Sequence, residues 1–362
     1  MSFNFKKKGN QNKDYNDRYI YSYKEKTSGG ENASTKKSNK KNWLCSLGII
    51  IFLIIGLVGG AMLYVYNKLD SINYKPVEDT AELTSDSDNS GLLQEKMVLN
   101  VALFGIDRRS EAETKSRSDS SLILSIDSRR KKIKLTSLMR DIWTDIPGYK
   151  PNRLNVAIAH GGEKLAIQTI QKTFGIKIDR YATVDFESFK EIVDIIGGID
   201  LSLSAKEAKY INGDLIYYKS ASPLLPIEDG TYHLDGDKTL SYARARKVQT
   251  PEGLHDDFAR TFRQRRVLST IMNKMKKCSL PQVLEVIEKA GPYINANFKK
   301  SEIMSLGKNS LEYLDYTFED FRLPTNDNTK EANIQGMSVI VIPDMKKARY
   351  DLAKFIYEDS IQ

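Results

Sequence analysis

The sequence predicts an α/β protein: a three-layer α-β-α domain with a central mixed sheet, preceded by one transmembrane helix. Two runs of almost uninterrupted apolar residues, at 98–107 and 121–127, are typical of strands buried in the centre of a sheet. Helical stretches lie between and after such strands, and this mixture favours a layered α/β domain. An uncharged segment at 43–66 predicts the membrane helix.

Residues 1–42 form a basic arm that we expect to be disordered, because they lack periodic apolar positions. They contain 11 Lys/Arg against 4 Asp/Glu, a net charge of +7 out of +8 for the whole chain. The remainder of the protein is therefore close to neutral. A role in membrane topology or lipid contact explains this basic charge better than nucleic-acid binding does.

The segment "WLCSLGIIIFLIIGLVGGAMLYVY" at 43–66 has 24 residues and no charge, enough to span a bilayer core of about 30 Å with some tilt. It is longer than the apolar core of a cleaved signal peptide and lacks a small-residue cleavage site. Because lysines precede it, the positive-inside rule places the arm in the cytoplasm. Everything after Lys68 is then extracellular, which is a single-pass type II topology.

After the span we expect a polar linker at 67–96, a main domain at 97–277, and a C-terminal extension of helices and a strand at 278–362 that packs on it. The two cysteines cannot pair, since Cys45 lies in the span and Cys278 lies outside. An exported domain without a disulfide fits a Gram-positive surface protein better than a small secreted scaffold.

The elements follow in order from the apolar patterns. The expected strands cover 98–107, 121–127, 132–141, 196–204 and 337–342. The expected helices cover 162–174, 186–196, 257–275, the regions near 280–290 and 301–313, and a last segment that ends near 358. The Gly197-Gly198 pair ends the helix before it, because glycine readily takes the backbone conformation of a helix C-cap.

Two acidic residues bracket the first loop: Asp107 directly follows one strand and Asp119 directly precedes the next. If these strands are neighbours, their carboxylates converge. Two carboxylates, completed by phosphate oxygens and water, are what Mg²⁺ prefers. Asp107 and Asp119 are therefore candidate metal ligands. The alternative is that each serves only as a turn residue or helix cap.

Arginines stand near the same ends of the predicted elements. Arg117 lies in the first loop and Arg140 ends a strand. In "SYARARK", Arg244 and Arg246 would share one face of an extended segment and could both close on one anion. Each of these residues alone is more often a surface residue.

The stretch "DFARTFRQRR" at 257–266 adds a helix with inward-facing polar groups. At about 100° per residue, Asp257, Arg260 and Gln264 fall in the sector that continues into apolar residues. Arg263 lies at the edge of that sector and Arg266 on the far side, so both are expected to be solvated. An inward guanidinium needs a partner, because leaving it unpaired is costly. The alternatives are an anion site or an ordinary solvated face.

Other chemistries have little support. No zinc-ligand spacing, nucleophile elbow or phosphate-binding Walker loop is present, and the three histidines read as structural residues. Five arginines, one amide and two acids instead suit a diphosphate, whose remaining charge a metal would offset.

These residues resemble the LytR-CpsA-Psr family of Gram-positive envelope proteins. The resemblance runs from about Asn100 to Gln264, and the single anchor agrees with it. Seven blocks occur in the family order: "NVALFGIDRR", "RSDSSLILSID", "LTSLMRDIWTDIPG", "LNVAIAHGG", "VDFESFKEIVDIIGGIDL", "LDGDKTLSYARAR" and "DFARTFRQ". Ala259 and Thr239 depart from the usual glycine and alanine, and the loop at 247–255 has no recognised counterpart.

The resemblance implies a phosphotransferase with its catalytic domain at 97–277. It would move a glycopolymer from an undecaprenyl-pyrophosphate carrier to peptidoglycan, commonly to the 6-hydroxyl of N-acetylmuramic acid, and bind the lipid tail between sheet and helices. By position, Asp107 and Asp119 would bind Mg²⁺, and Asp119, Arg140 and Arg260 would be catalytic. The pyrophosphate cradle would comprise Arg117, Arg140, Arg244, Arg246, Arg260 and Gln264.

We therefore expect a membrane-anchored, extracellular, Mg²⁺-dependent glycopolymer transferase. Its partners would be a polyprenyl-pyrophosphate-linked glycopolymer such as a capsule or teichoic acid, peptidoglycan and the membrane, but no nucleic acid. One alternative is a hydrolase that uses water as the acceptor on the same site. Another is a non-catalytic envelope regulator or binding protein.

Overall fold

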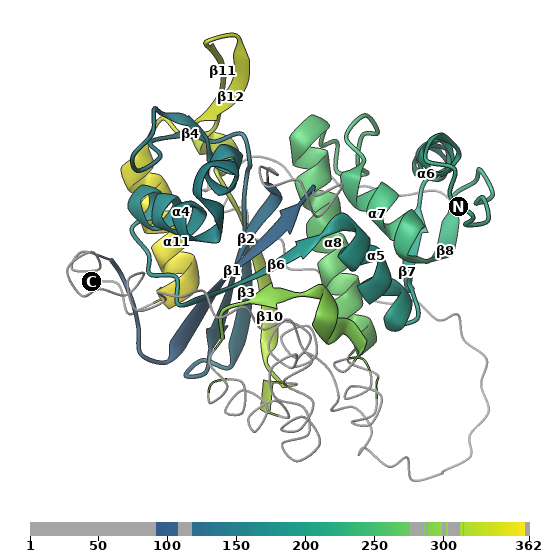
Figure 1. Ribbon diagram of the computed structural model, residues 1–362, viewed down its shortest axis with the longest axis horizontal. Coiled ribbons are helices and arrows are strands. Elements are labelled where there is room, and N and C mark those ends of the chain that lie inside the picture. Colours follow the sequence, from purple (N-terminus) through teal and green to yellow (C-terminus); the bar gives the residue numbers. More distant parts are fainter. Residues whose placement is uncertain are drawn as a thin grey trace, which may run out of the picture.

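The computed structural model of the protein describes residues 92–107, 118–275, 278, 286, 289–298, 302, 312–313 and 315–358 (Figure 1). The expected arm and membrane span and most of the linker lie outside these residues, as do most of the helices expected near 280–290 and 301–313. Over the part of the chain that the structure describes, no helix combines the length and apolar character needed to cross a membrane. The span at 43–66 stays a prediction.

A six-stranded mixed sheet forms the centre of the molecule (Figure 1). Its order is β10-β3-β2-β1-β6-β9; β1 pairs with β6 and β10 with β3 in parallel, and the other neighbours are antiparallel. Its strands are β1 (Val98–Ile106), β2 (Ser118–Asp127), β3 (Lys132–Leu138), β6 (Arg180–Asp185), β9 (Asn295–Ala296) and β10 (Thr317–Leu323). The predicted α/β fold with a central mixed sheet is confirmed. β9 and β10 come from the segment expected to be a C-terminal extension.

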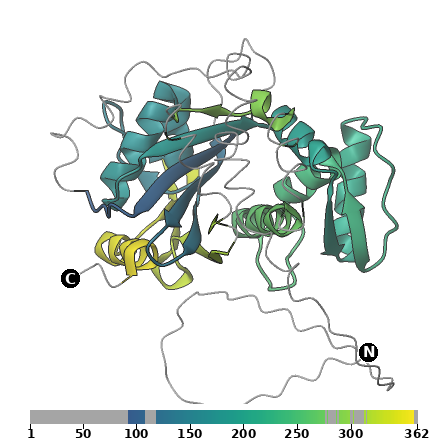
Figure 2. The ribbon, with the colours of Figure 1, turned by 90° about the horizontal axis from the view of Figure 1, so that it is seen from below.

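Helices pack against both faces of this sheet (Figure 2). Successive side chains of a strand point to opposite faces, so Val101 and Leu103 enter one core while Ala102 and Phe104 enter the other. The second core is closed by α4 (Ala157–Phe174) and α11 (Met345–Tyr357). The first is closed by α5 (Phe186–Ile195), α6 (Ala205–Tyr217), α7 (Gly236–Arg244) and α8 (Asp256–Met275).

Several elements differ from the prediction. The strand expected at 196–204 exists as β7 (Ile199–Leu203), but it pairs with β8 (Gly230–Leu234) in a separate sheet. The strand expected at 337–342 is β12 (Met337–Val341), which forms a hairpin with β11 (Lys330–Ile334). The helix expected at 162–174 begins earlier, at Ala157, and is interrupted at Gly161 and Gly162, where Gly162 has a φ of 62°.

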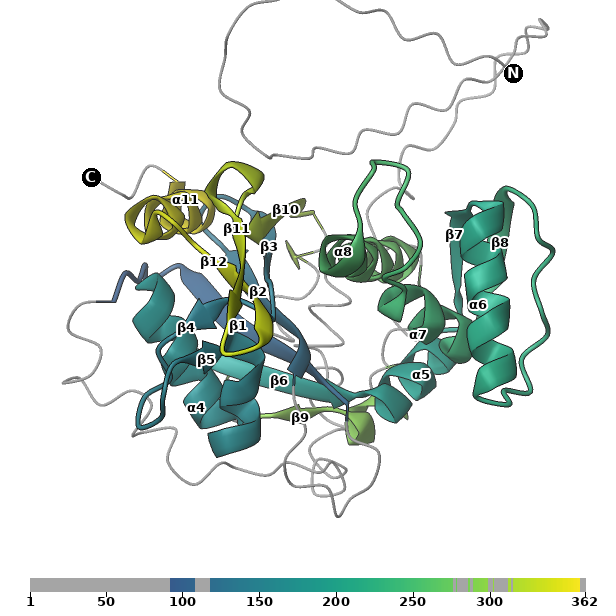
Figure 3. The same ribbon diagram turned by 90° about the horizontal axis from the view of Figure 1, so that it is seen from above.

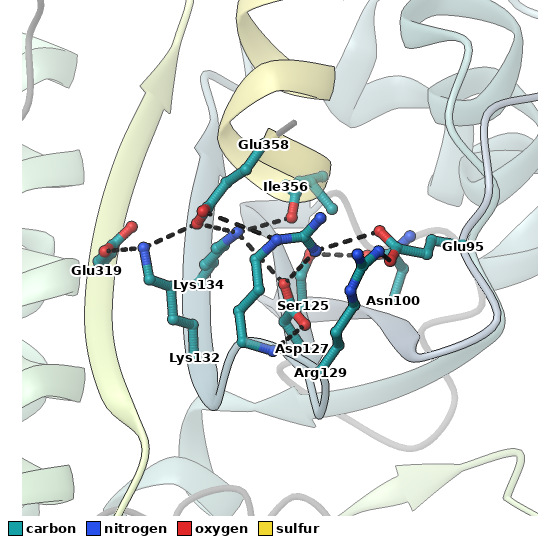
Figure 4. Close-up of polar contacts among 11 residues, drawn as sticks. Glu95, Asn100, Ser125, Asp127, Arg129, Lys132, Lys134, Glu319, Ile356 and Glu358 are labelled. Atoms are coloured by element: carbon teal, nitrogen blue, oxygen red, sulfur yellow. Dashed lines mark hydrogen bonds and ion pairs between the residues drawn. The ribbon is translucent and has the colours of Figure 1, made fainter. Parts of the chain in front are cut away.

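An ionic cluster joins the C-terminal end of α11 to the central sheet (Figure 4). Lys134 on β3 is fully buried and donates to the carbonyl of Ile356 at 2.7 Å; it also pairs with Glu358 at 2.9 Å. Lys132 reaches Glu358 at 2.8 Å and Glu319 on β10 at 2.9 Å. The two lysines therefore connect the final turn of the described chain to two strands.

Glu358→Gln should lower the free energy of unfolding by about 2–3 kcal/mol near pH 7. Burial tends to raise the pKa of Glu358, but hydrogen bonds and attraction from Lys132 and Lys134 lower it to about 2. Because the folded pKa is depressed, the stabilisation is complete above the unfolded pKa near 4.5 and disappears as pH falls toward 2.

Urea denaturation at several pH values measures this effect. Glu331→Gln, an exposed substitution on β11, is the control and should change stability by less than about 0.5 kcal/mol. A difference between the wild type and Glu358→Gln that persists unchanged at pH 2 would contradict the ionic explanation.

Candidate active site

The first two strands bring Asp107 and Asp119 to the same end of the sheet. β1 and β2 are antiparallel neighbours: Ile106 pairs with Ser118 and Gly105 with Ser120, so Asp119 is an extra residue in a β-bulge. Asp107 directly follows Ile106. Bulges commonly redirect a side chain beside an active site. The expected proximity of the two strand ends is thus present, while Arg117, in the loop between them, lies outside the described residues.

The Asp119 carboxylate lies among three guanidinium groups. Arg140, just beyond β3, forms a short ion pair with it. Arg260 on α8 approaches the same oxygen at 3.4 Å, and Arg246, beyond α7, does so at 3.8 Å. Cations from three separate elements therefore converge on one carboxylate at the end of the sheet.

Asp257 is a second point of convergence for the same arginines. Its Oδ1 atom lies 2.7 Å from Nη2 of Arg260, 3.4 Å from Nε of Arg140 and 4.0 Å from Nε of Arg246. Burial raises the pKa of Asp257, and the positive charges of Arg260 and Arg140 oppose that shift. Asp257 was predicted to point inward, and its contacts confirm this.

A third carboxylate extends the cluster away from α8. Asp141 contacts Nε of Arg140 at 3.3 Å and Nη1 of Arg153 at 3.4 Å. Burial tends to lower the pKa of Arg140, but three neighbouring aspartates raise it above its usual value. We call these seven residues the Arg-Asp cluster: Asp119, Arg140, Asp141, Arg153, Arg246, Asp257 and Arg260.

Arg260 is the most deeply buried cation of this cluster, at 2% exposure, as its inward orientation predicted. Burial lowers its pKa to about 10, with Asp257 opposing the shift. It therefore remains positively charged near neutral pH. Gln264, one turn further along α8, is half-buried, and its side chain makes no hydrogen bond to another described residue.

The prediction that Arg263 and Arg266 are ordinary solvated cations is wrong. Arg263 is fully buried and donates to Glu207 on α6 at 2.9 and 3.1 Å. Arg266 is half-buried and donates to the Tyr242 hydroxyl and the Ser202 carbonyl at 2.8 and 2.6 Å. The reason is that α8 is covered on opposite sides, by the sheet and by α6 and α7 (Figure 3).

The expected pairing of Arg244 and Arg246 on an extended segment is also wrong. Arg244 is the last residue of α7, and Ala245 begins the extended chain. Arg246 reaches Asp119 and Asp257, whereas Arg244 lies 4.9 Å from the Phe186 ring and 5.5 Å from the Tyr218 ring. Among the described residues, no ion pair joins Arg244 to the three aspartates of the Arg-Asp cluster.

Two members of the cluster had little or no signal in the sequence. Arg153 lies in β5 (Asn152–Arg153), which pairs with β4 (Trp143–Thr144) and so turns back toward Asp141. Such two-residue strands have no recognisable pattern. Asp141 directly follows Arg140, and sequence spacing alone does not mark it as part of the site. Within the described residues, no group of three or more His, Cys, Asp or Glu residues is placed to bind a metal.

A sequence model of the LytR_cpsA_psr family matches residues 61–353. The chain is 30% identical, over 82% of its length and 94% of the relative's, to the polyisoprenyl-teichoic acid–peptidoglycan teichoic acid transferase TagU of Bacillus mycoides.

Solved structures share the fold. B. subtilis TagV matches with a TM-score of 0.56 and 22% identity, covering 73% of this chain and 98% of that one. The family protein YwtF (TagT), solved with bound octaprenyl pyrophosphate lipid, matches with a TM-score of 0.54 and 21% identity, covering 73% and 94%.

Proposed function

The chain belongs to the LytR_cpsA_psr family, and from this premise we propose that it transfers a glycopolymer from a polyprenyl-diphosphate carrier to peptidoglycan. The name of the B. mycoides relative supports the reaction class, and the octaprenyl pyrophosphate bound to YwtF supports the carrier. Teichoic acid is the polymer that the relative's name specifies, and capsule or another wall glycan fits the same chemistry.

The Arg-Asp cluster is the observation that carries this proposal. Four guanidinium groups and three carboxylates, from five separate segments of the chain, meet at one end of the sheet. Guanidinium groups suit phosphate oxygens because their planar forks can donate two parallel hydrogen bonds. The aspartates keep these forks oriented before a substrate binds, so that little reorganisation is needed when charge develops on the transferring phosphoryl group.

In the proposed reaction, a peptidoglycan hydroxyl oxygen attacks the phosphorus nearest the sugar. A new phosphorus–oxygen bond forms, the bond to the bridging diphosphate oxygen breaks, and polyprenyl phosphate leaves. Arg260 and Arg140 stabilise the charge on the transferring group. Asp119 or Asp141 accepts the hydroxyl proton, since both carboxylates are less buried than Asp257.

Asp107 and Asp119 are the proposed Mg²⁺ ligands. Two carboxylates on neighbouring strand ends fit the ion, because Mg²⁺ commonly takes one or two protein carboxylates and completes its shell with phosphate oxygens and water. The ion would supply positive charge to the diphosphate. The same proposal includes the single span at 43–66 and an extracellular catalytic domain.

Transfer should be tested with the full chain in nanodiscs, a radiolabelled glycan on a polyprenyl diphosphate, and peptidoglycan oligomers. Formation of labelled peptidoglycan together with polyprenyl monophosphate would support the proposal. Release of free glycan phosphate at the same rate without peptidoglycan would identify a hydrolase instead. Binding without turnover would identify a regulator or binding module.

Asp107→Asn should raise the Mg²⁺ concentration that half-saturates transfer by about tenfold, because one of the two charged ligands becomes neutral. Titration of Mg²⁺ into the transfer assay measures this, and Mn²⁺ binding followed by electron paramagnetic resonance provides a readout independent of activity. Asp145→Asn, an exposed substitution, is the control. An unchanged metal requirement in Asp107→Asn would remove Asp107 from the metal site.

A further inference from the structure

Large exposed apolar side chains are concentrated in one segment of the described chain. Nine such residues are exposed among the described residues, and five of them lie within 216–227. These are Ile216 at 64%, Tyr217 at 77%, Tyr218 at 54%, Leu224 at 54% and Ile227 at 60% exposure, here called the tyrosine patch. Scattered exposed apolar residues are normal, but a concentration of this kind marks an interaction surface.

The fold displays this patch in a fixed way. After α6 the chain turns back along the helix, and the Asn212 side chain holds it with bonds to the amide and carbonyl of Leu225, both at 2.7 Å. Leu225 is buried, while Leu224 and Ile227 on either side of it face outward. The loop is thus anchored so that its apolar residues remain exposed.

One end of the patch contacts Arg244 at the end of α7. The Tyr218 ring contacts the Arg244 guanidinium, and Nη2 of Arg244 lies 3.4 Å from the Tyr218 hydroxyl. Arg244 is two residues from Arg246, which belongs to the Arg-Asp cluster. The same stretch of sequence also exposes lysines Lys206, Lys209 and Lys219 and the acids Glu228 and Asp229.

We propose that the tyrosine patch inserts into the interfacial layer of the lipid bilayer and thereby holds the Arg-Asp cluster against a membrane-borne diphosphate. This inference rests on the proposed function for its substrate. Tyrosine is enriched at membrane interfaces because its ring enters the apolar layer while its hydroxyl stays hydrated. Lys219, which directly follows Tyr218, can attract anionic headgroups.

Two other occupants fit these residues less well. A protein–protein interface usually buries about 800 Å² on each partner, a larger area than five side chains provide. Its core is also depleted of lysine, whereas Lys219 directly follows Tyr218 here. Sugar rings would stack on the tyrosines but leave the aliphatic Leu224 and Ile227 unused. The mixture of exposed tyrosines and aliphatic side chains favours lipid.

The chain between the predicted span and the described residues permits this contact. Residues 67–91 comprise 25 positions, which reach about 80–90 Å when fully extended. A domain of this size is about 50 Å across. Any face of the domain could therefore contact the bilayer. The linker does not determine which face does so, and the tyrosine patch does. α6 lies at the outer edge of the molecule, on the side away from α4 and α11 (Figures 1 and 3).

The test places an environment-sensitive fluorophore at residue 217 of the full chain, after Cys45→Ser and Cys278→Ser, in nanodiscs of phosphatidylglycerol and phosphatidylethanolamine. Spin-labelled lipids should quench this label at least about twofold more than a label at residue 350. Tyr350 is a matched control because it is an exposed helical tyrosine on α11. Equal lipid quenching at the two sites would overturn the proposal.

The other occupants have their own signatures. Shielding of the label at residue 217 from water only when glycopolymer is added would overturn the lipid assignment. Self-quenching of the label that appears only with two chains per disc would do the same.

The combined variant Tyr217→Ser, Leu224→Ser and Ile227→Ser should transfer glycopolymer about tenfold more slowly from a bilayer-borne carrier. Its rate with a water-soluble, short-chain carrier should be unchanged, and an equal loss with both carriers would contradict the proposal. If neither carrier supports transfer by the unmodified chain, the proposed function fails, while the lipid-quenching contrast still decides the membrane contact.

Discussion

Replacing Arg260 with alanine is expected to reduce transfer by about 10²-fold or more, as losing a preorganised charge donor typically does. The Arg260 guanidinium contacts both Asp119 and Asp257 and is almost completely buried. In this environment a fixed positive charge acts more strongly on the transferring phosphoryl group than it would in water. The substitution removes that charge and leaves Asp257 with weaker counter-charges.

Arg265→Ala on the same helix is the matched control. Arg265 is also buried, at 9% exposure, but its Nε pairs with Asp320 on β10 at 2.7 Å and not with the Arg-Asp cluster. Both substitutions remove a buried cation from α8, so both should lower stability. Only Arg260→Ala should lower the transfer rate of the folded protein by more than about threefold.

The measurement is the single-turnover transfer rate, corrected for the folded fraction at a temperature below both unfolding transitions. Arg260→Lys serves as a further comparison, since it restores the charge without the planar fork and should recover only part of the rate. Equal losses in Arg260→Ala and Arg265→Ala would mean that the arginines of α8 act through stability alone.

The parts of the fold predicted from sequence were those with strong local patterns. The apolar runs of β1 and β2 identified the central strands, and the helical periodicity identified α5 and α8. β6 and β10 were missed although both lie in the central sheet. β10, "TFEDFRL", has two adjacent acidic residues between two phenylalanines, and Asp320 on it is paired with Arg265. The counter-charge of Asp320 comes from α8, and no local pattern in β10 reveals it.

The sequence predicted those parts of the site in which a single strand, loop or helix determines where a residue lies. The bracketing of one loop by Asp107 and Asp119 and the inward phase of Arg260 were visible locally, and the structure places them as expected. The helical spacing of apolar residues, however, predicts only one buried face. α8 has more than one buried face, because α6 and α7 cover its outer side. Arg263 was assigned to solvent for that reason.

Arg263→Ala is expected to lower the free energy of unfolding by about 3–5 kcal/mol, the usual effect of removing one partner of a buried ion pair. Arg263 is fully buried and Glu207 is 2% exposed, so the remaining carboxylate would be left without its counter-charge. Arg263 also donates to the carbonyls of Ala245 and Val248 at 3.2 and 2.9 Å. It therefore fixes the segment that carries Arg246.

Urea denaturation of the purified full chain measures this loss, with Arg129→Ala as the control. Arg129 is 64% exposed and pairs with Glu95 at the surface, so its removal should change stability by less than about 1 kcal/mol. Arg263→Met combined with Glu207→Gln should recover part of the loss, because the buried carboxylate is neutralised. A loss in Arg263→Ala no larger than that in Arg129→Ala would mean that Arg263 is solvated, as the helix phase alone suggested, and that α6 does not cover α8 at this point.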